Sequence, residues 1–337
     1  MRTVFLGTSD FAAAVLTRIA GEGSDEGADR GEAGERGEAS DSGARRQSGR
    51  SDSSQHRPAL VLTRPDRPAG RGRKLVSPPV AEAARALGLE LAQPESVNDP
   101  AARELIASAA PDAVVVCAFG ALIKEPLLSD YELLNVHPSL LPRWRGAAPI
   151  ERAIMAGDER TGVSIMRLAA GLDSGPVCLA ESEPIHPDDT YGSLAARLEQ
   201  GGSDLLLSAL SALELGEPLP FAEQDENLVS YAEKIGPVDR LLDPLRAAIE
   251  LERVVRALSP HIGARVALPD ETLLGVQRAA LATTQSDTGD RNGVYAQDGR
   301  LLLGCVDGAL ELLDVQPPGK RSMDADAFLR GHGLSSR

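Results

Sequence analysis

Four mainly apolar runs constrain the fold of this chain more than any other feature. They are TVFLG (3–7), ALVLT (59–63), AVVVCAF (113–119) and LLNVHP (133–138). Continuous apolar runs of this length suit strands that are covered on both faces, whereas half-exposed strands alternate apolar and polar residues. Helical spacing predicts helices between them, at 11–20, near 80–87 and near 101–109, with a short strand near Glu90. Such alternation predicts a mostly parallel, doubly wound α/β sheet, in which sites form beyond the carboxyl ends of the strands.

Residues 21–57 interrupt this pattern with a segment of different composition. The segment contains no Leu, Ile, Val, Phe, Tyr or Trp. It therefore cannot bury enough apolar area to offset the entropy lost on ordering, and we predict a disordered surface insert. Without the insert, the first two strands and the first helix form a compact βαβ unit.

The second half of the chain changes from α/β to β-rich patterning. TGVSIMRL (161–168) and PVCLAESEPI (176–185) predict a hairpin that extends the sheet, and leucines from Leu194 to Leu213 predict one helix, or two joined at Gly201–Gly202. Short strand-like runs after residue 260 and a helical segment at 246–258 predict a small β-barrel domain. We therefore expect a catalytic domain at 1–210, a polar, proline-containing linker at 211–225 and a barrel domain at 226–337.

The formal net charge of the chain is -15 at pH 7. Phosphate binding depends on Lys and Arg, so any RNA site must be a local basic patch. One candidate is TRPDRPAGRGRKL (63–75), where Asp66 is the only acid among five cations. A flexible, solvated turn is the alternative interpretation of the same segment. The five cations are Arg64, Arg67, Arg71, Arg73 and Lys74.

The sequence argues against a membrane span and against a metal site. No apolar run approaches the ~18 residues that a membrane helix requires, and the first apolar run predicts a strand, not a signal peptide. Cys117, Cys178 and Cys305 lie far apart, without the close spacing of zinc or redox motifs, so we expect packed thiols. We expect a soluble cytoplasmic protein with no metal and no obligate protein partner.

Three polar residues form a candidate acyl-transfer site. Asn135 and His137 are two positions apart on one predicted strand, so both side chains point to the same face, near the end of the strand. Asp173 lies at the tip of a glycine-bounded turn, AAGLDSG (169–175). An amide for an oxyanion, an imidazole, and a carboxylate to orient it form a coherent set when the substrate supplies its own amine. A histidine without such neighbours more often has a structural than a catalytic role, so His137 alone would not indicate an active site.

The segment NVHPSLLPRWRGAAPI (135–150), followed by GLDSG, resembles the folate-dependent formyltransferases. FLGTSDFA (5–12), the basic segment 63–75 and LLDVQPPGKRSM (312–323) resemble the methionyl-tRNA branch of that family. The resemblance covers nearly the whole chain apart from the insert. It implies a Rossmann-like formyltransferase domain followed by an OB-like β-barrel.

The resemblance also implies roles for individual residues. Asn135, His137 and Asp173 would be catalytic, the donor would be 10-formyltetrahydrofolate, and the acceptor would be initiator methionyl-tRNA. The alternatives are a related formyltransferase acting on glycinamide ribonucleotide or an amino sugar, and a non-catalytic RNA-binding module. The residues implied to border the folate are Ser139, Leu140, Leu141, Pro142, Phe119 and Gly120. Those implied to contact tRNA are Arg67, Arg71, Arg73, Lys74, Lys320 and Arg321. Trp144 could stack on a base or the pterin, or could pack at the rim of the site.

Overall fold

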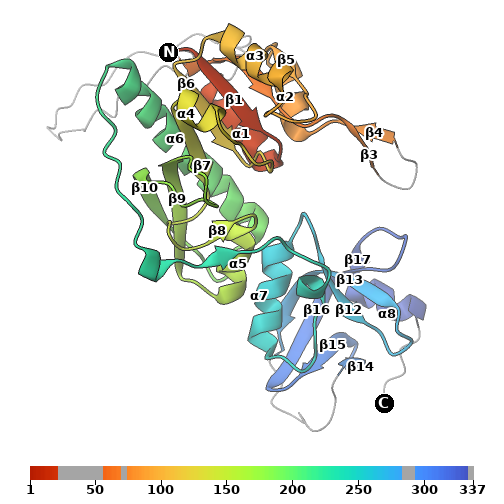
Figure 1. Ribbon diagram of the computed structural model, residues 1–337. Coiled ribbons are helices and arrows are strands. Elements are labelled where there is room, and N and C mark those ends of the chain that lie inside the picture. The colour runs from red at the N-terminus through yellow and green to blue at the C-terminus, as the bar shows by residue number, and fades with distance from the viewer. Residues whose placement is uncertain (22–55, 70–73, 283–292, 333–337) are drawn as a thin grey trace, which may run out of the picture.

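The computed structural model describes residues 1–21, 56–69, 74–282 and 293–332. These residues form an α/β lobe and a β-rich lobe, joined by an extended segment (Figure 1). Most of the predicted insert, residues 22–55, lies outside the described part of the chain, as do Arg71 and Arg73.

The first lobe is built on a seven-stranded sheet in the order β10-β9-β7-β6-β1-β2-β5. The strands from β7 to β5 are parallel, and the antiparallel hairpin β9–β10 extends the sheet beyond β7. This confirms the predicted mostly parallel sheet and its hairpin. The strands are β1 (Thr3–Gly7), β2 (Pro58–Leu62), β5 (Leu91–Ala92), β6 (Ala113–Cys117), β7 (Leu133–His137), β9 (Arg160–Arg167) and β10 (Val177–Pro184).

Helices cover both faces of this sheet because its strands are apolar on both sides (Figure 1). One face packs against α1 (Asp10–Ile19), α2 (Pro79–Ala86), α5 (Pro149–Ala156) and α6 (Tyr191–Glu214). The other packs against α3 (Pro100–Ala109) and the short α4 (Leu127–Asp130). Val136 faces α6, so its neighbours Asn135 and His137 on the same strand point toward the opposite face.

The segment after residue 190 forms one long helix, α6, and not two. Thr190 and Ser193 form a capping box that fixes its start. The helix continues through Gly201 and Gly202, and a Cβ on Gly202 would lie 3.0 Å from Val136 and 3.1 Å from Val163. Glycine is therefore used here for close helix–sheet packing, not to break the helix.

The second lobe contains an antiparallel sheet in the order β12-β13-β16-β15-β14, with β17 paired to β16. The sheet curls into a half-barrel that packs against α7 (Ala248–Leu258) and α8 (Ala325–His332), in agreement with the predicted small barrel. The strands are β12 (Ala264–Ala267), β13 (Leu273–Leu281), β14 (Gly293–Gln297), β15 (Arg300–Cys305), β16 (Gly308–Gln316) and β17 (Met323–Asp324). The elements of the two lobes that are absent from the sequence-based prediction include helices α4, α5 and α8 and strands β13, β14 and β17.

The segment between the lobes is paired to the first lobe over much of its length. We call residues 222–232 the strap. Ala222 exchanges two backbone hydrogen bonds of 2.9 Å with Val177, and β11 (Tyr231–Ala232) pairs in parallel with β8 (Arg145–Gly146). Short 3-10 helices lie at Glu226–Leu228, within the strap, and at Val238–Arg240, after it. The polar stretch predicted as a linker thus merges into a segment that is part of the first lobe's surface.

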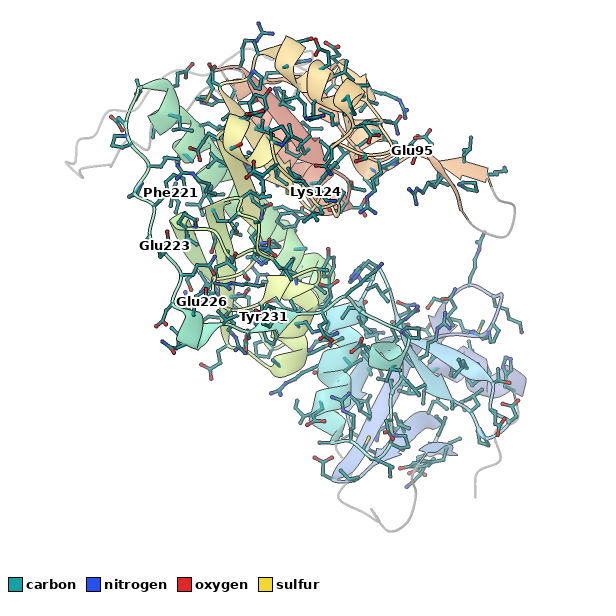
Figure 2. The ribbon with its side chains drawn as sticks, in the orientation of Figure 1. Glu95, Lys124, Phe221, Glu223, Glu226 and Tyr231 are labelled. Carbon is teal, nitrogen blue, oxygen red and sulfur yellow. The ribbon has the colours of Figure 1, made fainter. Side chains whose placement is uncertain are left out.

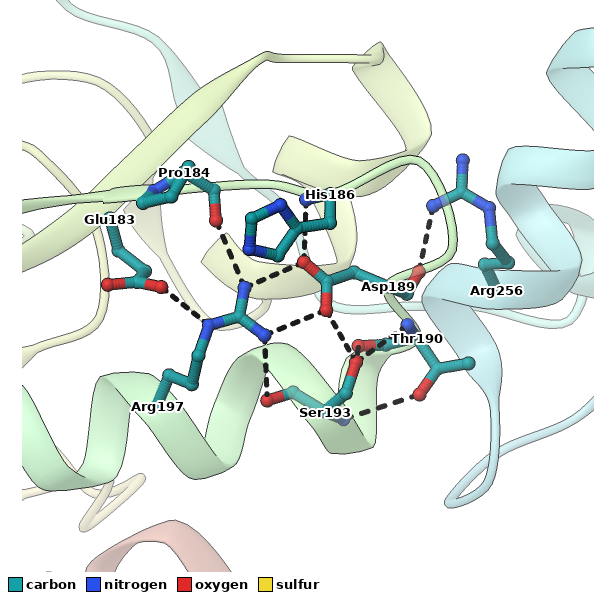
Figure 3. Close-up of polar contacts among 8 residues, drawn as sticks. All are labelled: Glu183, Pro184, His186, Asp189, Thr190, Ser193, Arg197 and Arg256. Atoms are coloured by element: carbon teal, nitrogen blue, oxygen red, sulfur yellow. Dashed lines mark hydrogen bonds and ion pairs between the residues drawn. The ribbon is translucent and has the colours of Figure 1, made fainter.

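A buried carboxylate, Asp189, anchors the start of α6 and the contact between the lobes (Figure 3). Its side chain is 5% exposed, and both carboxylate oxygens accept hydrogen bonds from Arg197, at 2.7 and 2.8 Å. Its backbone carbonyl accepts a hydrogen bond of 2.8 Å from Arg256 of α7. Burial raises the pKa of Asp189, but the bonds from Arg197 and Ser193 outweigh burial and hold that pKa well below its usual range.

We expect Asp189→Asn to lower the free energy of unfolding by about 2–3 kcal/mol at pH 7, because Arg197 loses the more buried of its two charged partners, Asp189 and Glu183. Since the folded-state pKa is lowered from 3.8, the stabilisation is present above pH 3.8 and is lost as the pH falls through the folded-state value. Urea unfolding of the wild type and the variant, at pH 7 and below pH 3.8, measures the difference in their free energies of unfolding. The exposed neighbour Asp188, changed to Asn, is the control. A wild-type-to-variant difference that does not shrink in acid would contradict the assignment.

Candidate active site

Asn135 and His137 lie at the carboxyl end of β7, near the middle of the sheet. They are 7% and 4% exposed. The carboxamide of Asn135 makes no hydrogen bond with any residue that the structure describes. The Asn135 amide is not among the enclosed, unpaired polar atoms of the described residues, so it reaches the surface at this edge of the sheet and is available to a bound molecule.

The imidazole of His137 has an oxygen atom beside each of its nitrogens. Nε2 lies 2.9 Å from the backbone carbonyl of Trp144, and Nδ1 lies 3.7 Å from a carboxylate oxygen of Asp173. The first distance is a hydrogen bond and fixes a proton on Nε2, whereas the second is too long for one. The ring is therefore held by the backbone of Trp144, while Nδ1 remains directed at the carboxylate.

Asp173 is held in a constrained position in the turn between β9 and β10. Its φ of 45° lies in the left-handed region, and its carboxylate accepts a hydrogen bond of 2.9 Å from the backbone N–H of Gly146. Gly146 has a φ of 131°, and a Cβ there would lie 2.6 Å from the carbonyl of Ala232 in the strap. Only glycine fits this position, because a side chain would push Ala232 of the strap away from β8.

The loop that follows His137 is fixed from two sides. Ser139 is fully buried, and its hydroxyl donates a hydrogen bond of 2.7 Å to the carbonyl of Arg143. Ser164 on β9 donates to the carbonyl of Ser139 at 2.8 Å and accepts from the N–H of Leu141 at 3.2 Å. The segment Ser139–Pro142 therefore forms a rigid wall directly beside His137.

Phe119 and Gly120 follow the neighbouring strand β6, so they lie at the same edge of the sheet. Thr8, which follows β1, donates a hydrogen bond of 2.9 Å to the carbonyl of Phe119. The carboxyl ends of β1, β6 and β7 thus meet where the sequence predicted a site. Asn135, His137, Asp173, the Ser139–Pro142 loop and the Phe119–Gly120 turn are brought together there.

The predicted tRNA-contacting cations lie away from this edge. Arg67 and Lys74 belong to a small hairpin, β3 (Arg67–Ala69) and β4 (Lys74–Val76), that projects from the first lobe (Figure 1). The Arg67 side chain is 70% exposed and lies 4.0 Å from Glu95. Lys320 and Arg321 are exposed in the turn between β16 and β17 of the second lobe. The structure leaves all four cations accessible to a large ligand.

Sequence reasoning did not assign a role to the backbone around Trp144 or to the strap. The guanidinium carbon of Arg143 lies 4.4 Å from the centroid of the Trp144 ring. The indole N–H of Trp144 donates a hydrogen bond of 2.8 Å to Asp158. These contacts agree with the rim-packing interpretation. A cavity of about 380 Å³ beside Gly146 is lined by Leu172, Tyr231 and Lys234 among others. No motif could reveal it, because its walls come from distant segments.

The three cysteines are buried and free, as expected. Burial raises the pKa of Cys178 and of Cys305 to about 11, so both remain neutral thiols. Within the described ranges there is no group of three or more side chains suited to hold a metal ion. A helix both long enough and apolar enough to cross a bilayer is likewise not found among those residues.

Two family models match the chain: formyl transferase over residues 37–210, and formyl transferase C-terminal domain over residues 234–333. The chain therefore belongs to the formyltransferase class. The chain is 42% identical over 287 residues to a protein named methionyl-tRNA formyltransferase from Methylococcus capsulatus, spanning 85% of this chain and 92% of that one. A protein of the same name from Ruegeria pomeroyi is 38% identical over 333 residues, spanning 98% and 97%. The chain belongs to the methionyl-tRNA formyltransferase family, which confirms the resemblance seen in its motifs.

Solved structures agree on the fold. An N-formyltransferase from Helicobacter canadensis, in complex with folinic acid and dTDP-3-aminofucose, matches with a TM-score of 0.59 at 13% identity. The match spans 92% of this chain and 98% of that one. At this identity the likeness concerns the fold alone.

Proposed function

We propose that this chain transfers the formyl group of 10-formyltetrahydrofolate to the α-amino group of methionine on initiator tRNA. The observation that carries the proposal is the unused Asn135 amide beside His137, at the carboxyl edge of the sheet, in a chain of this family. Formylation of methionyl-tRNA, assayed beside glycinamide ribonucleotide, tests it. Equal rates with the two acceptors would contradict it.

In the proposed reaction the amine attacks the formyl carbon, which forms the new C–N bond and turns the formyl oxygen into an oxyanion. The Asn135 amide donates a hydrogen bond to this oxyanion. His137 donates a second from Nδ1 in its doubly protonated form, since its Nε2 proton is already bonded to the Trp144 carbonyl. Asp173, beside Nδ1, takes the proton that the attacking amine loses. The bond between the formyl carbon and N10 then breaks as Asp173 gives up that proton to N10, and tetrahydrofolate leaves. The chemistry requires no nucleophilic side chain.

We assign the folate to the walls formed by Ser139–Pro142 and by Phe119 and Gly120, which are rigid and adjoin His137. The aminoacyl end of the tRNA would enter on the other side, through the cavity beside Gly146 and Tyr231. The second lobe would bind tRNA through Lys320 and Arg321. A cytoplasmic location remains a prediction that cell fractionation can test.

We expect the triple change Arg71→Ala, Arg73→Ala and Lys74→Ala to raise KM for the tRNA and to flatten its salt dependence. The slope of log K against log salt should fall by about 0.7–0.9 for each cation–phosphate interaction that the change removes. Lys124, an exposed cation of the first lobe (Figure 2), changed to Ala, is the matched control and should leave the slope unchanged. If the Kd for folate rose as much as KM for tRNA, the hairpin would belong to the donor site.

A further inference from the structure

Gln224 in the strap holds the loop that carries Asp173. Its Nε2 donates hydrogen bonds to the backbone carbonyls of Asp173, at 2.8 Å, and of Gly175, at 2.7 Å. These carbonyls lie on either side of Ser174, so one amide group binds the tip of the turn at two points. The two residues are 51 and 49 positions away in sequence.

The orientation of the Gln224 amide is set by a buried arginine. Arg145 is 3% exposed, and its Nε donates a hydrogen bond of 3.0 Å to Oε1 of Gln224. Its remaining guanidinium nitrogens bond to Glu226, which lies two residues further along the strap, with the shortest contact at 2.8 Å. Because arginine can only donate, Oε1 must face it, and Nε2 must face the two carbonyls.

The strap is anchored on both sides of Gln224. Before it, Ala222 bonds to Val177 at the start of β10, and after it β11 pairs with β8. Figure 2 shows Phe221, Glu223, Glu226 and Tyr231 along the same segment, against the first lobe. The side chain of Gln224 therefore has little freedom to move away from the loop.

The loop needs such support because its conformation is strained. Asp173 has a φ of 45°, and a Cβ on Gly175 would lie 2.0 Å from the carbonyl of Arg167. A non-glycine residue in the left-handed region costs of the order of a kcal/mol and persists only where the surroundings impose it. The bonds from Gln224 and from the N–H of Gly146 are the polar contacts that impose it.

We propose that Gln224 is a positioning residue for the reaction: it sets the place of the Asp173 carboxylate relative to His137. The inference rests on the proposed function, in which Asp173 takes the proton of the attacking amine. Only glutamine serves both partners, since it presents an acceptor to Arg145 and a donor to the two carbonyls. Glutamate would keep the bond from Arg145 but could not donate to the carbonyls, whereas methionine would make neither interaction.

Gln224→Glu is the decisive variant, because it retains the bond from the buried Arg145 and should still fold, with a small drop in melting temperature from the two hydrogen bonds it loses. We expect kcat for methionyl-tRNA to fall about 10- to 100-fold, as a displacement of about 1 Å at a reacting group does. The Kd for a folate analogue should stay within about twofold. Gln224→Met, which adds no charge, should lower kcat by a similar factor. Glu223→Gln, at an exposed neighbour, is the control and should leave kcat unchanged.

The Asp173→Ala background separates positioning from a general structural role. In this background, adding Gln224→Glu should lower kcat by no more than about twofold, because the carboxylate that Gln224 positions is already absent. A full additional loss, or a loss with glutamate but none with methionine, would overturn the proposal. If Asp173→Ala itself retained full kcat, the proposed role of Asp173 would fail, and the role of Gln224 with it. If Asp173→Ala were damaging while both Gln224 variants were fully active, the role of Gln224 alone would fail.

Discussion

Asn135→Ala is expected to lower kcat for methionyl-tRNA formylation by about 10²–10³. The side chain is buried, makes no hydrogen bond within the described structure, and points from the end of β7 toward the same face as His137. Its amide is therefore free to meet an oxyanion that exists only after attack on the formyl carbon. Because the contact forms in the transition state, kcat and kcat/KM should fall together.

The binding of the donor distinguishes this role from a structural one. The Kd for a folate analogue should stay near the wild-type value in Asn135→Ala, because the walls at Ser139–Pro142 and Phe119 remain. Asn135→Asp keeps the size but removes the donor, so it should be at least as damaging. Asn98→Ala changes a half-buried amide of the same lobe that bonds to Leu122 and Lys124, and it should leave kcat unaltered. An unchanged kcat in Asn135→Ala would remove the oxyanion role.

The parallel sheet could be predicted because its signal is local. The central strands β1 and β6 are nearly continuous apolar runs, and the alternation of strands and helices restricts the topology to a doubly wound sheet. Asn135 and His137 could be paired because a period of two places them on one face. Helix α5 also had local signals, Pro149 at its first position and Gly157 just after its end. These signals were present in the sequence, although the helix was not predicted.

The contacts that hold the site residues in place could not be predicted, because backbone atoms and segments distant in sequence make them. The carbonyl of Trp144 holds His137, and the N–H of Gly146 holds Asp173; neither depends on a side chain that a motif displays. The strap is polar and rich in turn residues, which is the pattern of a linker. Its pairing with Val177 and with β8 depends on the folded lobe, and no periodicity in 216–227 indicates it.

We expect His137→Ala and Asp173→Ala each to lower kcat by at least the same factor of about 10²–10³. His137 lies between the Trp144 carbonyl and the Asp173 carboxylate, so removing the ring removes both a donor to the oxyanion and the group that Asp173 faces. Removing the carboxylate removes the acceptor for the amine proton. Neither loss can be compensated by the rigid loops around them.

The double variant tests whether the two groups act as one unit. The His137 Nδ1 atom lies 3.7 Å from the Asp173 carboxylate, so the carboxylate would stabilise a protonated ring even without a direct hydrogen bond. Catalytic hydrogen bonds are often long in unbound structures and shorten in the complex. The loss of kcat in the double variant should therefore be far smaller than the product of the two single losses. Fully multiplicative losses would show that His137 and Asp173 act independently. Asp173 would then serve only the amine proton, and the Trp144 carbonyl alone would orient the imidazole.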